Sequence, residues 1–252
     1  KMMQHNKNRV LIVGGSGFLG KETAKLLKKF GYNVFVADLP FTKNNYLDGI
    51  PFIPLDITNP QSIDNLEVGK NDIIIDLASK QYHDKVPYFK KKKYFDEVNL
   101  YGAINLMNKA INSSVGGYIF FSSDMVYGIP KKIPLLEKDE LNPVAEYGRS
   151  KAKAEKALID KAKNFFPLVI FRPRLIIGPG RLGVFKKLFW FIHKSLPVPI
   201  IGSGNNCYQM ISVFDCASAI LLSIQKGIPN DVFNLGSEKK IKVKNLLKDL
   251  IK

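Results

Sequence analysis

Short apolar runs alternate with segments of helical periodicity over the first two thirds of the chain. Continuous runs of β-branched and aromatic residues are typical of strands that are buried on both faces of a parallel sheet. Such runs predict strands at 9–13, 33–37, 51–56, 72–78, 117–122 and 167–172. Helical periodicity between them predicts helices at 18–30, 60–67, 95–112 and 146–164. This alternation predicts an α/β fold with a doubly wound parallel sheet.

The pattern changes after residue 174, where prolines divide the chain into shorter pieces. Helices are expected at 182–194, at 214–226 and from residue 243 onward, and strands are expected at 198–201 and 231–235. We therefore expect one large domain over residues 1–174 and a smaller C-terminal lobe over residues 175–252.

Composition narrows the class of protein. The 252 residues are 46% hydrophobic, which supports a sizeable core and argues against disorder. The formal net charge of +16 favours anionic partners such as phosphorylated small molecules, although most lysines lie on polar helix faces, as solubility requires. Cys207 and Cys216 are too few for a disulfide framework and lack metal-ligand spacing to histidine. No apolar run reaches the roughly 20 residues of a membrane span, so a cytoplasmic protein is expected. No nucleic-acid-binding motif is present, so no nucleic-acid partner is expected.

A glycine loop follows the first predicted strand. "VLIVGGSGFLG" places Gly15, Gly17 and Gly20 in G-x-G-x-x-G spacing, directly before a helix. Such glycines allow a tight turn and bring a pyrophosphate to the helix N-terminus, as in Rossmann-type sheets. Asp38 ends the second strand, where a carboxylate accepts hydrogen bonds from a ribose and repels a 2′-phosphate. NAD is thus expected rather than NADP, with Lys43 as a nearby cation that would soften the preference.

A tyrosine and a lysine are spaced to share one face of a helix. "EYGRSKAKAEKAL" places Tyr147 and Lys151 at i and i+4. The ordinary pKa of tyrosine is about 10, so a tyrosine that acts as a base near neutral pH needs a pKa lowered by about three. A lysine one turn away and a cationic nicotinamide ring would supply much of this lowering. The glycine loop upstream and the serine-rich strand end at "FFSSDMVYG" raise the weight of the pair.

The order of these motifs resembles the extended short-chain dehydrogenase/reductase family, the NAD-dependent nucleotide-sugar epimerases and dehydratases. The resemblance covers nearly the full chain, through "GGSGFLG", "DLAS", "NLYGAINLMNKA", "FSSDMVYG", "YGRSK", "RPRLIIGPG", "GSGNNCYQMISVFDCASAI" and "VFNLGS". It implies an NAD-binding Rossmann domain over 1–174, a substrate-binding lobe over 175–252 and a homodimer. Because typical members are longer, the lobe is expected to be reduced or incomplete.

The resemblance implies a role for each matching residue. Tyr147 would be the catalytic base, Lys151 would hold the nicotinamide ribose, and Ser123 would hydrogen-bond the reacting sugar hydroxyl. The residues expected to contact NAD are Gly14, Gly15, Gly17, Phe18, Leu19, Gly20, Asp38, Asp56, Ile57, Leu77, Ala78, Ser79, Asn99, Ser122, Tyr147, Lys151 and Pro173. The residues expected near the substrate are Asp124, Met125, Arg174, Arg181, Tyr208 and Gln209. No metal site is expected.

Two departures from the family pattern bear on the reaction. The 4,6-dehydratases of the family carry an Asp-Glu pair, or at least the glutamate, where this chain has Asp124 and Met125. A thioether cannot take the proton that the glutamate takes, so dehydration by that route loses its base. Asp124 itself is open to interpretation as an acid, a sugar ligand or a turn cap. In addition, the arginine that grips the diphosphate in many members has no counterpart among 207–209, which leaves Arg174 or Arg181 as substitutes.

Epimerisation of a nucleotide sugar at a ring carbon, with C4 expected, is the favoured hypothesis because it needs no second carboxylate. A reductase or dehydrogenase of a carbonyl or hydroxyl substrate would use Ser123, Tyr147 and Lys151 equally well. A 4,6-dehydratase is less favoured because of Met125, and a non-catalytic cofactor sensor is less favoured because the three residues are present together.

Overall fold

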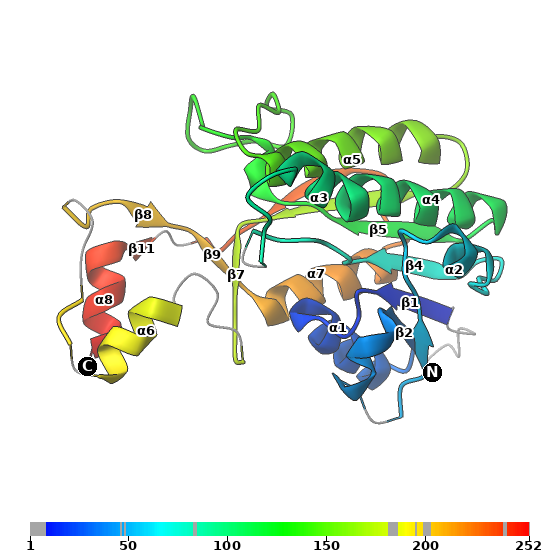
Figure 1. The fold of residues 1–252 in the computed structure, drawn as a ribbon, viewed down its shortest axis with the longest axis horizontal. Coiled ribbons are helices and arrows are strands. Elements are labelled where there is room, and N and C mark those ends of the chain that lie inside the picture. The colour runs from blue at the N-terminus through cyan, green and yellow to red at the C-terminus, as the bar shows by residue number, and fades with distance from the viewer. Residues whose placement is uncertain are drawn as a thin grey trace.

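The computed structural model describes residues 9–45, 47, 49–82, 85–180, 186–194, 196–198, 203–238 and 241–251, without the side chains of 43–45, 186–189 and 249–251. Its centre is a seven-stranded parallel sheet with the order β10-β6-β5-β4-β1-β2-β3 (Figure 1). The strands are β1 (Arg9–Val13), β2 (Asn33–Asp38), β3 (Phe52–Pro54), β4 (Ile73–Asp76), β5 (Gly117–Phe121), β6 (Leu168–Pro173) and β10 (Val232–Leu235). The strand order reverses between β1 and β4, which confirms the predicted Rossmann-type doubly wound sheet.

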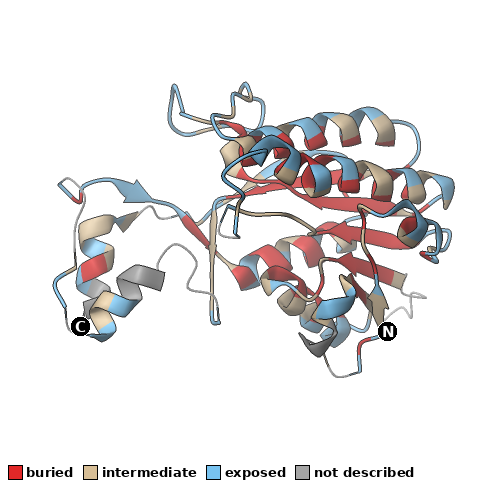
Figure 2. Cartoon of the chain, in the orientation of Figure 1, coloured by how far each residue is buried: buried red, intermediate tan, exposed pale blue. Residues whose placement is uncertain are grey.

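Helices cover both faces of the sheet (Figure 1). One face carries α2 (Pro60–Asp64), α3 (Lys91–Asp96), α4 (Ala103–Asn112) and α5 (Glu146–Ala162); the other carries α1 (Phe18–Lys29) and α7 (Val213–Gln225). Two separate apolar clusters fill these layers, and Figure 2 shows the buried positions concentrated on the strands and on the inner sides of the helices. The α3 and α4 segments are continuous through a π-helical segment, η2 (Glu97–Gly102).

The chain beyond residue 174 divides between two places. α7 packs against α1, and β10 joins the main sheet beside β6, so both belong to the large layered body. An outlying part holds α6 (Lys186–His193), β8 (Cys207–Tyr208), β11 (Ile241–Lys242) and α8 (Val243–Ile251), at the left of Figure 1. Two further short strands, β7 (Leu175–Ile177) and β9 (Met210–Ser212), pair with each other in parallel and connect the two parts. The sequence-based division at residue 174 therefore does not coincide with the edge of the main sheet.

Differences from the sequence-based elements have local causes. The expected strands 51–56 and 72–78 shorten to β3 and β4, because their last residues leave the sheet at its carboxyl edge. The short strands β7, β8, β9 and β11 were not predicted, since two or three residues carry no measurable periodicity. Two short helical turns, η1 (Pro40–Asn45) and η3 (Asp124–Val126), were also missed. The expected strand 198–201 lies mostly outside the described residues.

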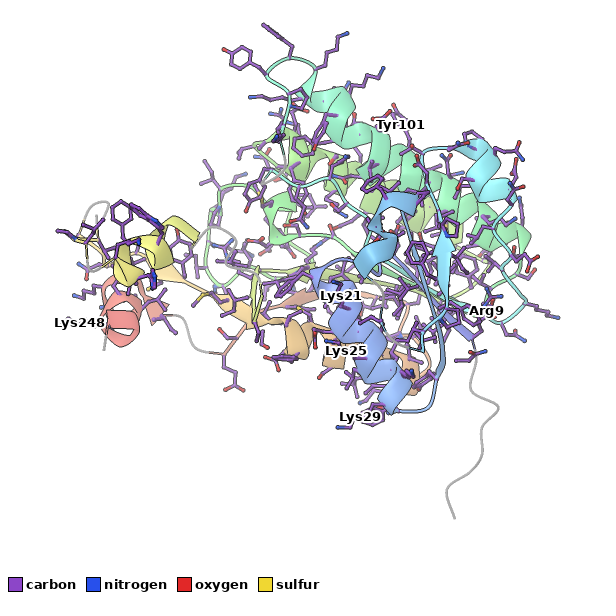
Figure 3. The ribbon with its side chains drawn as sticks, turned by 60° about the horizontal axis from the view of Figure 1, so that its bottom comes forward. Arg9, Lys21, Lys25, Lys29, Tyr101 and Lys248 are labelled. Atoms are coloured by element: carbon purple, nitrogen blue, oxygen red, sulfur yellow. The ribbon has the colours of Figure 1, made fainter. Side chains whose placement is uncertain are left out.

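Several lysines lie on the outer surface of α1. Figure 3 shows Lys21, Lys25 and Lys29 spaced along the solvent side of α1. Lys25 forms an exposed ion pair with Glu22 one turn away, which contributes little to stability. No helix of the described part of the chain is long and apolar enough to cross a membrane.

Gly20, on the inner side of α1, sets the distance between this helix and the glycine loop that follows β1. A Cβ on Gly20 would lie 2.5 Å from the Cα of Gly15 and 2.6 Å from its carbonyl oxygen, so α1 would have to move outward. We expect Gly20→Ala to lower the free energy of unfolding by about 2 kcal/mol or more, since backbone atoms cannot give way as a flexible side chain does. Urea unfolding of purified protein measures this change.

Lys29→Ala is the matched control for this substitution, because Lys29 is exposed on the same helix. Its expected effect stays within about 0.5 kcal/mol. Equal midpoints and slopes for Gly20→Ala and the parent chain would show that helix and loop are not in tight contact.

Candidate active site

A cavity of about 1030 Å³ opens along the carboxyl ends of the parallel strands. Its walls come from the residues that follow β1, β2, β3, β4, β5 and β6, which meet at one edge of the sheet, and from α5. In doubly wound sheets, ligands bind at this edge beside the point where the strand order reverses. The position and size of the cavity suit a dinucleotide together with a second molecule.

The glycine loop forms one end of the cavity. Gly14 has a φ of +76°, and a Cβ there would lie 2.8 Å from the backbone nitrogen of Ala78. The Gly14 N–H donates to the carbonyl of Ala37 at 2.8 Å, and the Gly17 N–H donates to the carbonyl of Gly14 at 3.1 Å. Gly17 is the N-cap residue of α1, and no side chain caps the first turn of this helix by a hydrogen bond. This backbone cradle fits the pyrophosphate of a dinucleotide.

Asp38 lies on the cavity wall next to this loop. Its Oδ2 accepts from the backbone N–H of Ser16 at 3.0 Å, and its Oδ1 accepts from the N–H of Leu39 at 2.8 Å. The two hydrogen bonds fix the carboxylate between the glycine loop and the segment after β2. The side chain of Lys43, the nearby cation, lies outside the described side chains.

Most other residues expected to contact NAD line the same cavity. They are Gly14, Gly17, Phe18, Leu19, Gly20, Asp56, Ile57, Leu77, Ala78, Ser79, Ser122 and Pro173. Gly15 lies behind the loop, where a Cβ would meet Val36. Asn99 lies behind the wall and ties the segment after β4 to α5: it accepts from the Lys80 N–H at 2.8 Å and donates to Ser150 Oγ at 3.0 Å.

Tyr147 lies in the first turn of α5 and faces the cavity. Burial raises the pKa of Tyr147 to about 12, although hydrogen bonding with the side chains of Ser79 and Ser123 lowers it. The edges of Tyr82 and Phe95 contact its ring, with centroid distances of 5.8 and 5.9 Å. The protein alone therefore holds Tyr147 as a neutral phenol, and its use as a base requires a further positive charge in the cavity.

Lys151 lies one turn further along α5 and is 1% exposed. Its Nζ donates to the carbonyl of Phe121 at 2.9 Å and lies 4.6 Å from the centroid of the Phe120 ring. Burial lowers the pKa of Lys151 to about 8, although the charges of Asp76 and Glu155 oppose the lowering. An ammonium near its pKa can hold a ribose hydroxyl and can also respond to small changes of charge around it.

The turn after β5 places the serine beside the tyrosine. Ser123 Oγ accepts from the Met125 N–H at 3.2 Å, which caps η3, and donates to Asp124 Oδ1 at 3.3 Å. The other carboxylate oxygen of Asp124 forms an ion pair with Arg174. Asp124 and Arg174 line the cavity together with Met125. The carboxylate of Asp124 is thus already paired with an arginine in this structure.

Two buried charges hold α5 against the last strands. The guanidinium of Arg172 donates to both oxygens of Glu155, with distances from 2.6 to 3.1 Å. The same guanidinium donates to Tyr127 Oη at 2.7 Å, and Tyr127 Oη donates to Asn234 Oδ1 at 2.7 Å. This network connects β6, α5, the turn after β5 and β10.

Of the remaining residues predicted near the substrate, the structure places only one on the cavity wall among those it describes. Tyr208 lines the cavity. Gln209 instead donates from Nε2 to the carbonyl of Ser237 at 2.7 Å and packs against Gly236. Arg181 lies outside the described residues. Within the described part of the chain, no cluster of three or more metal-ligating side chains occurs.

Sequence reasoning missed several residues around Tyr147 and Lys151. Tyr82 and Phe95 frame Tyr147, and Asp76 acts on Lys151 from the end of β4. The only signal in the sequence was that a carboxylate ends an otherwise apolar strand, in "DIIIDLAS". Arg172 and Glu155 gave no signal, because their contact depends on how α5 lies on the sheet.

Comparisons with known proteins show the family to which this fold belongs. The family model described as "NAD dependent epimerase/dehydratase family" matches residues 10–236. The chain belongs to the NAD-dependent epimerase/dehydratase family. It is an enzyme family, and its recurrent cofactor is NAD.

Individual relatives carry different activities. An uncharacterized protein of Sinorhizobium fredii is 32% identical over 96% of this chain, and the chain spans 59% of that protein's length. The dTDP-D-glucose 4,6-dehydratase of Mus musculus is 29% identical over 96% of this chain and 72% of its own length. The UDP-glucose 4-epimerase of Thermotoga maritima, solved with UDP-glucose, has a TM-score of 0.83 and 26% identity over 96% of this chain and 81% of its own.

The residues of this family member fit NAD. Gly14 packs so closely on the backbone of Ala78 that no Cβ would fit, and Gly17 adds no side chain at the start of α1. Asp38 lies on the cavity wall, where a carboxylate would accept hydrogen bonds from an adenosine ribose. Ser122 lines the cavity, and its buried Oγ has no hydrogen-bond partner among the described residues, which leaves a polar atom of the wall unsatisfied without a ligand. Tyr147 and Lys151 would lie at the nicotinamide end.

Cofactor binding should release protons from Tyr147. The nicotinamide ring of NAD⁺ is cationic and would lower the pKa of Tyr147 from about 12. A pKa lowered on binding means that the complex holds fewer protons than the free protein between the two pKa values, so protons leave on binding at alkaline pH. Calorimetry at about pH 9 in two buffers of different ionisation enthalpy measures the number released.

Tyr147→Phe should reduce this proton release, whereas Tyr101→Phe, an exposed tyrosine on η2 outside the cavity, should leave it unchanged. The same release from the parent chain and from Tyr147→Phe would contradict the placement of the tyrosine beside the cationic ring.

Proposed function

We propose that this chain is an NAD-dependent epimerase of a nucleotide sugar, acting at a ring carbon, with C4 expected. The proposal is supported by the Ser123, Tyr147 and Lys151 arrangement at the inner end of a cavity that fits NAD. It is also supported by the family, in which the relatives named above include a UDP-glucose 4-epimerase and a dTDP-D-glucose 4,6-dehydratase.

The proposed chemistry assigns one task to each residue. Tyr147, deprotonated beside the cofactor, would accept the proton of a sugar hydroxyl, and Ser123 would hydrogen-bond that hydroxyl to orient it. Lys151 would hold a ribose hydroxyl and stabilise the tyrosinate by its charge. Bound NAD would supply a hydride acceptor that can return the hydride to the sugar. Tyr147 would give its proton back at the end, so the protein needs no second acid or base.

The residues that favour an epimerase over a dehydratase are Asp124 and Met125 in the turn after β5. Elimination of water requires a base for a carbon-bound proton and an acid for the leaving hydroxyl. Met125, which lines the cavity, offers neither function. Asp124 forms an ion pair with Arg174, so its carboxylate is already engaged by a cation in this structure.

The proposal is tested by incubating the full chain with UDP-, GDP- and dTDP-hexoses and following the sugar signals by NMR. The expected product is the epimer of one substrate. Tyr147→Phe should lower the rate by at least about 100-fold, because it removes the acid–base group. Asp124→Asn should keep the rate within about tenfold, because no step uses Asp124 as an acid.

Formation of a 4-keto-6-deoxy sugar would contradict the proposal. So would a loss of activity in Asp124→Asn as large as that in Tyr147→Phe.

A reductase or dehydrogenase would use the same three side chains with a cofactor that exchanges at every turnover. An epimerase regenerates its cofactor and is expected to retain it. Absorbance near 340 nm and cofactor extraction from the purified protein separate the two, and protein that carries no NAD would favour the reductase.

We further propose that Asp38 selects NAD over NADP, because a fixed carboxylate repels a 2′-phosphate. Asp38→Asn should lower the ratio of the NADP to the NAD dissociation constant by about tenfold or more, since one charge repulsion is lost. Titration of the cofactor-free variants with both cofactors measures the ratio.

Asp56→Asn is the matched control, because Asp56 also lines the cavity but accepts hydrogen bonds from Thr58 at a different point of the wall. It should change both affinities together and leave the ratio unaltered. An unchanged ratio in Asp38→Asn would refute the assignment.

The homodimer and the cytoplasmic location remain predictions. Tyr101, 59% exposed on the outer side of the helix layer in Figure 3, is available to a partner surface.

A further inference from the structure

A buried carboxylate that the proposed chemistry does not use lies beneath the cavity. Asp76 is the last residue of β4, at the centre of the sheet, and is 1% exposed. Its Oδ2 accepts from the hydroxyl of Tyr118 at 2.9 Å, and its Oδ1 accepts from the backbone N–H of Ala78 at 3.2 Å. A carboxylate is costly to bury, so its presence at this point calls for a compensating charge.

The compensating charge is Lys151. No lysine or arginine nitrogen of the described residues lies within ion-pair distance of Asp76. The Coulombic attraction of Lys151 nevertheless acts on Asp76, and that of Asp76 acts on Lys151. Glu155, the other carboxylate that acts on Lys151, already takes three hydrogen bonds from Arg172. Of the two carboxylates that act on Lys151, Asp76 is therefore the one without an arginine partner among the described residues, so Lys151 is the cation that balances its charge.

The register of the strands brings the two groups to the same place. Asp76 is paired with Phe120 in the neighbouring strand β5. The ammonium of Lys151 lies over the Phe120 ring and donates to the carbonyl of Phe121. Ile74, Tyr118 and Phe120 all pack in the apolar cluster beneath α4 and α5, and Asp76 follows Ile74 on the same face of the strand. Asp76 and Lys151 thus meet on one side of the sheet, with Phe120 next to both.

We propose that Asp76 is a positioning residue, whose buried carboxylate keeps Lys151 protonated at neutral pH and fixes the Ala78 backbone on the wall of the cofactor cavity. The proposal deepens the proposed function, because it rests on the role of Lys151 there. Tyr118 supports Asp76 as a neutral donor: it satisfies the carboxylate without cancelling its charge.

Burial and the neighbouring groups act on the pKa of Asp76 in opposite directions, and burial is the larger influence, so this pKa is raised overall. Burial raises the pKa of Asp76, while Lys151, the Tyr118 hydroxyl and the Ala78 N–H each lower it. Burial, and after it the charge and hydrogen bond of Asp76, raise the pKa of Tyr118 well above its usual value, so Tyr118 stays a donor. The other charged groups nearby are Glu155 and Arg172, which neutralise each other. Removal of the Asp76 charge should therefore make Lys151 lose its proton more easily.

The test follows the ionisation of Lys151 itself, without turnover. The full chain is prepared as purified with ¹³C-labelled lysine, and the Cε signal of Lys151 is assigned by its loss in Lys151→Arg. Its chemical shift is then followed against pH. In Asp76→Asn, which keeps the shape and the hydrogen-bonding atoms, the titration midpoint should fall by about one pH unit.

Two controls separate charge from packing. Tyr118→Phe removes the hydroxyl but keeps the charge of Asp76. It should leave the titration midpoint of Lys151 within roughly a few tenths of a pH unit of the parent value. Asp160→Asn removes an exposed carboxylate from α5 and should leave it unmoved. Should Asp76→Asn fail to fold, Asp76→Ser removes the same charge with a shorter hydrogen-bonding side chain. A midpoint in the charge-removing variant equal to that of the parent chain overturns the proposal.

Activity supplies an independent readout. With an identified substrate, the alkaline limb of the kcat/KM profile should move to lower pH in Asp76→Asn by the same amount as the NMR midpoint. If no nucleotide sugar is turned over but the NMR midpoint still moves, the proposed function fails and the role of Asp76 stands. If epimerisation is found but the midpoint does not move, the role of Asp76 fails alone.

Discussion

The buried ion pair between Arg172 and Glu155 is the contact on which the site depends. Arg172 comes from the end of β6 and Glu155 from the middle of α5, and both side chains are nearly inaccessible. Removal of one partner of such a pair would leave an uncompensated buried charge, at a cost of about 3–5 kcal/mol. Because the guanidinium also reaches Tyr127 and the Glu137 carbonyl, one side chain determines how the helix, the turn after β5 and the last strands meet.

The position of α5 decides what the cavity can do. This helix carries Tyr147 and Lys151 on one face, and a Cβ on Gly148 would lie 2.5 Å from the Met125 carbonyl, so helix and turn are in direct contact. Ser123 and Tyr147 thereby come within hydrogen-bonding reach. The tyrosine is protonated and the lysine is close to losing its proton in the protein alone. The site is thus set so that added charge in the cavity has a large effect on both groups.

The sequence predicted the parts of this arrangement that are local. Gly14 to Gly20 and Asp38 are found from spacing, because a tight turn and a strand end require particular residues close together in the chain. Tyr147 and Lys151 are found from helical spacing in the same way. Contacts between distant residues were not predictable: Asp76, Tyr118 and Lys151 come together only through the order of β4 and β5 and the placement of α5. The same reason explains why β10 and α7, expected in a separate lobe, lie on the main sheet.

The central claim is that the site moves a hydride and a hydroxyl proton without eliminating water. The most direct test is to run the reaction in deuterium oxide and to measure the mass of the sugar product and the position of any carbon-bound deuterium. The account predicts an epimer of unchanged mass, with no deuterium on carbon, because the same hydride leaves and returns. A product that has lost water and carries solvent deuterium on a ring carbon would contradict it.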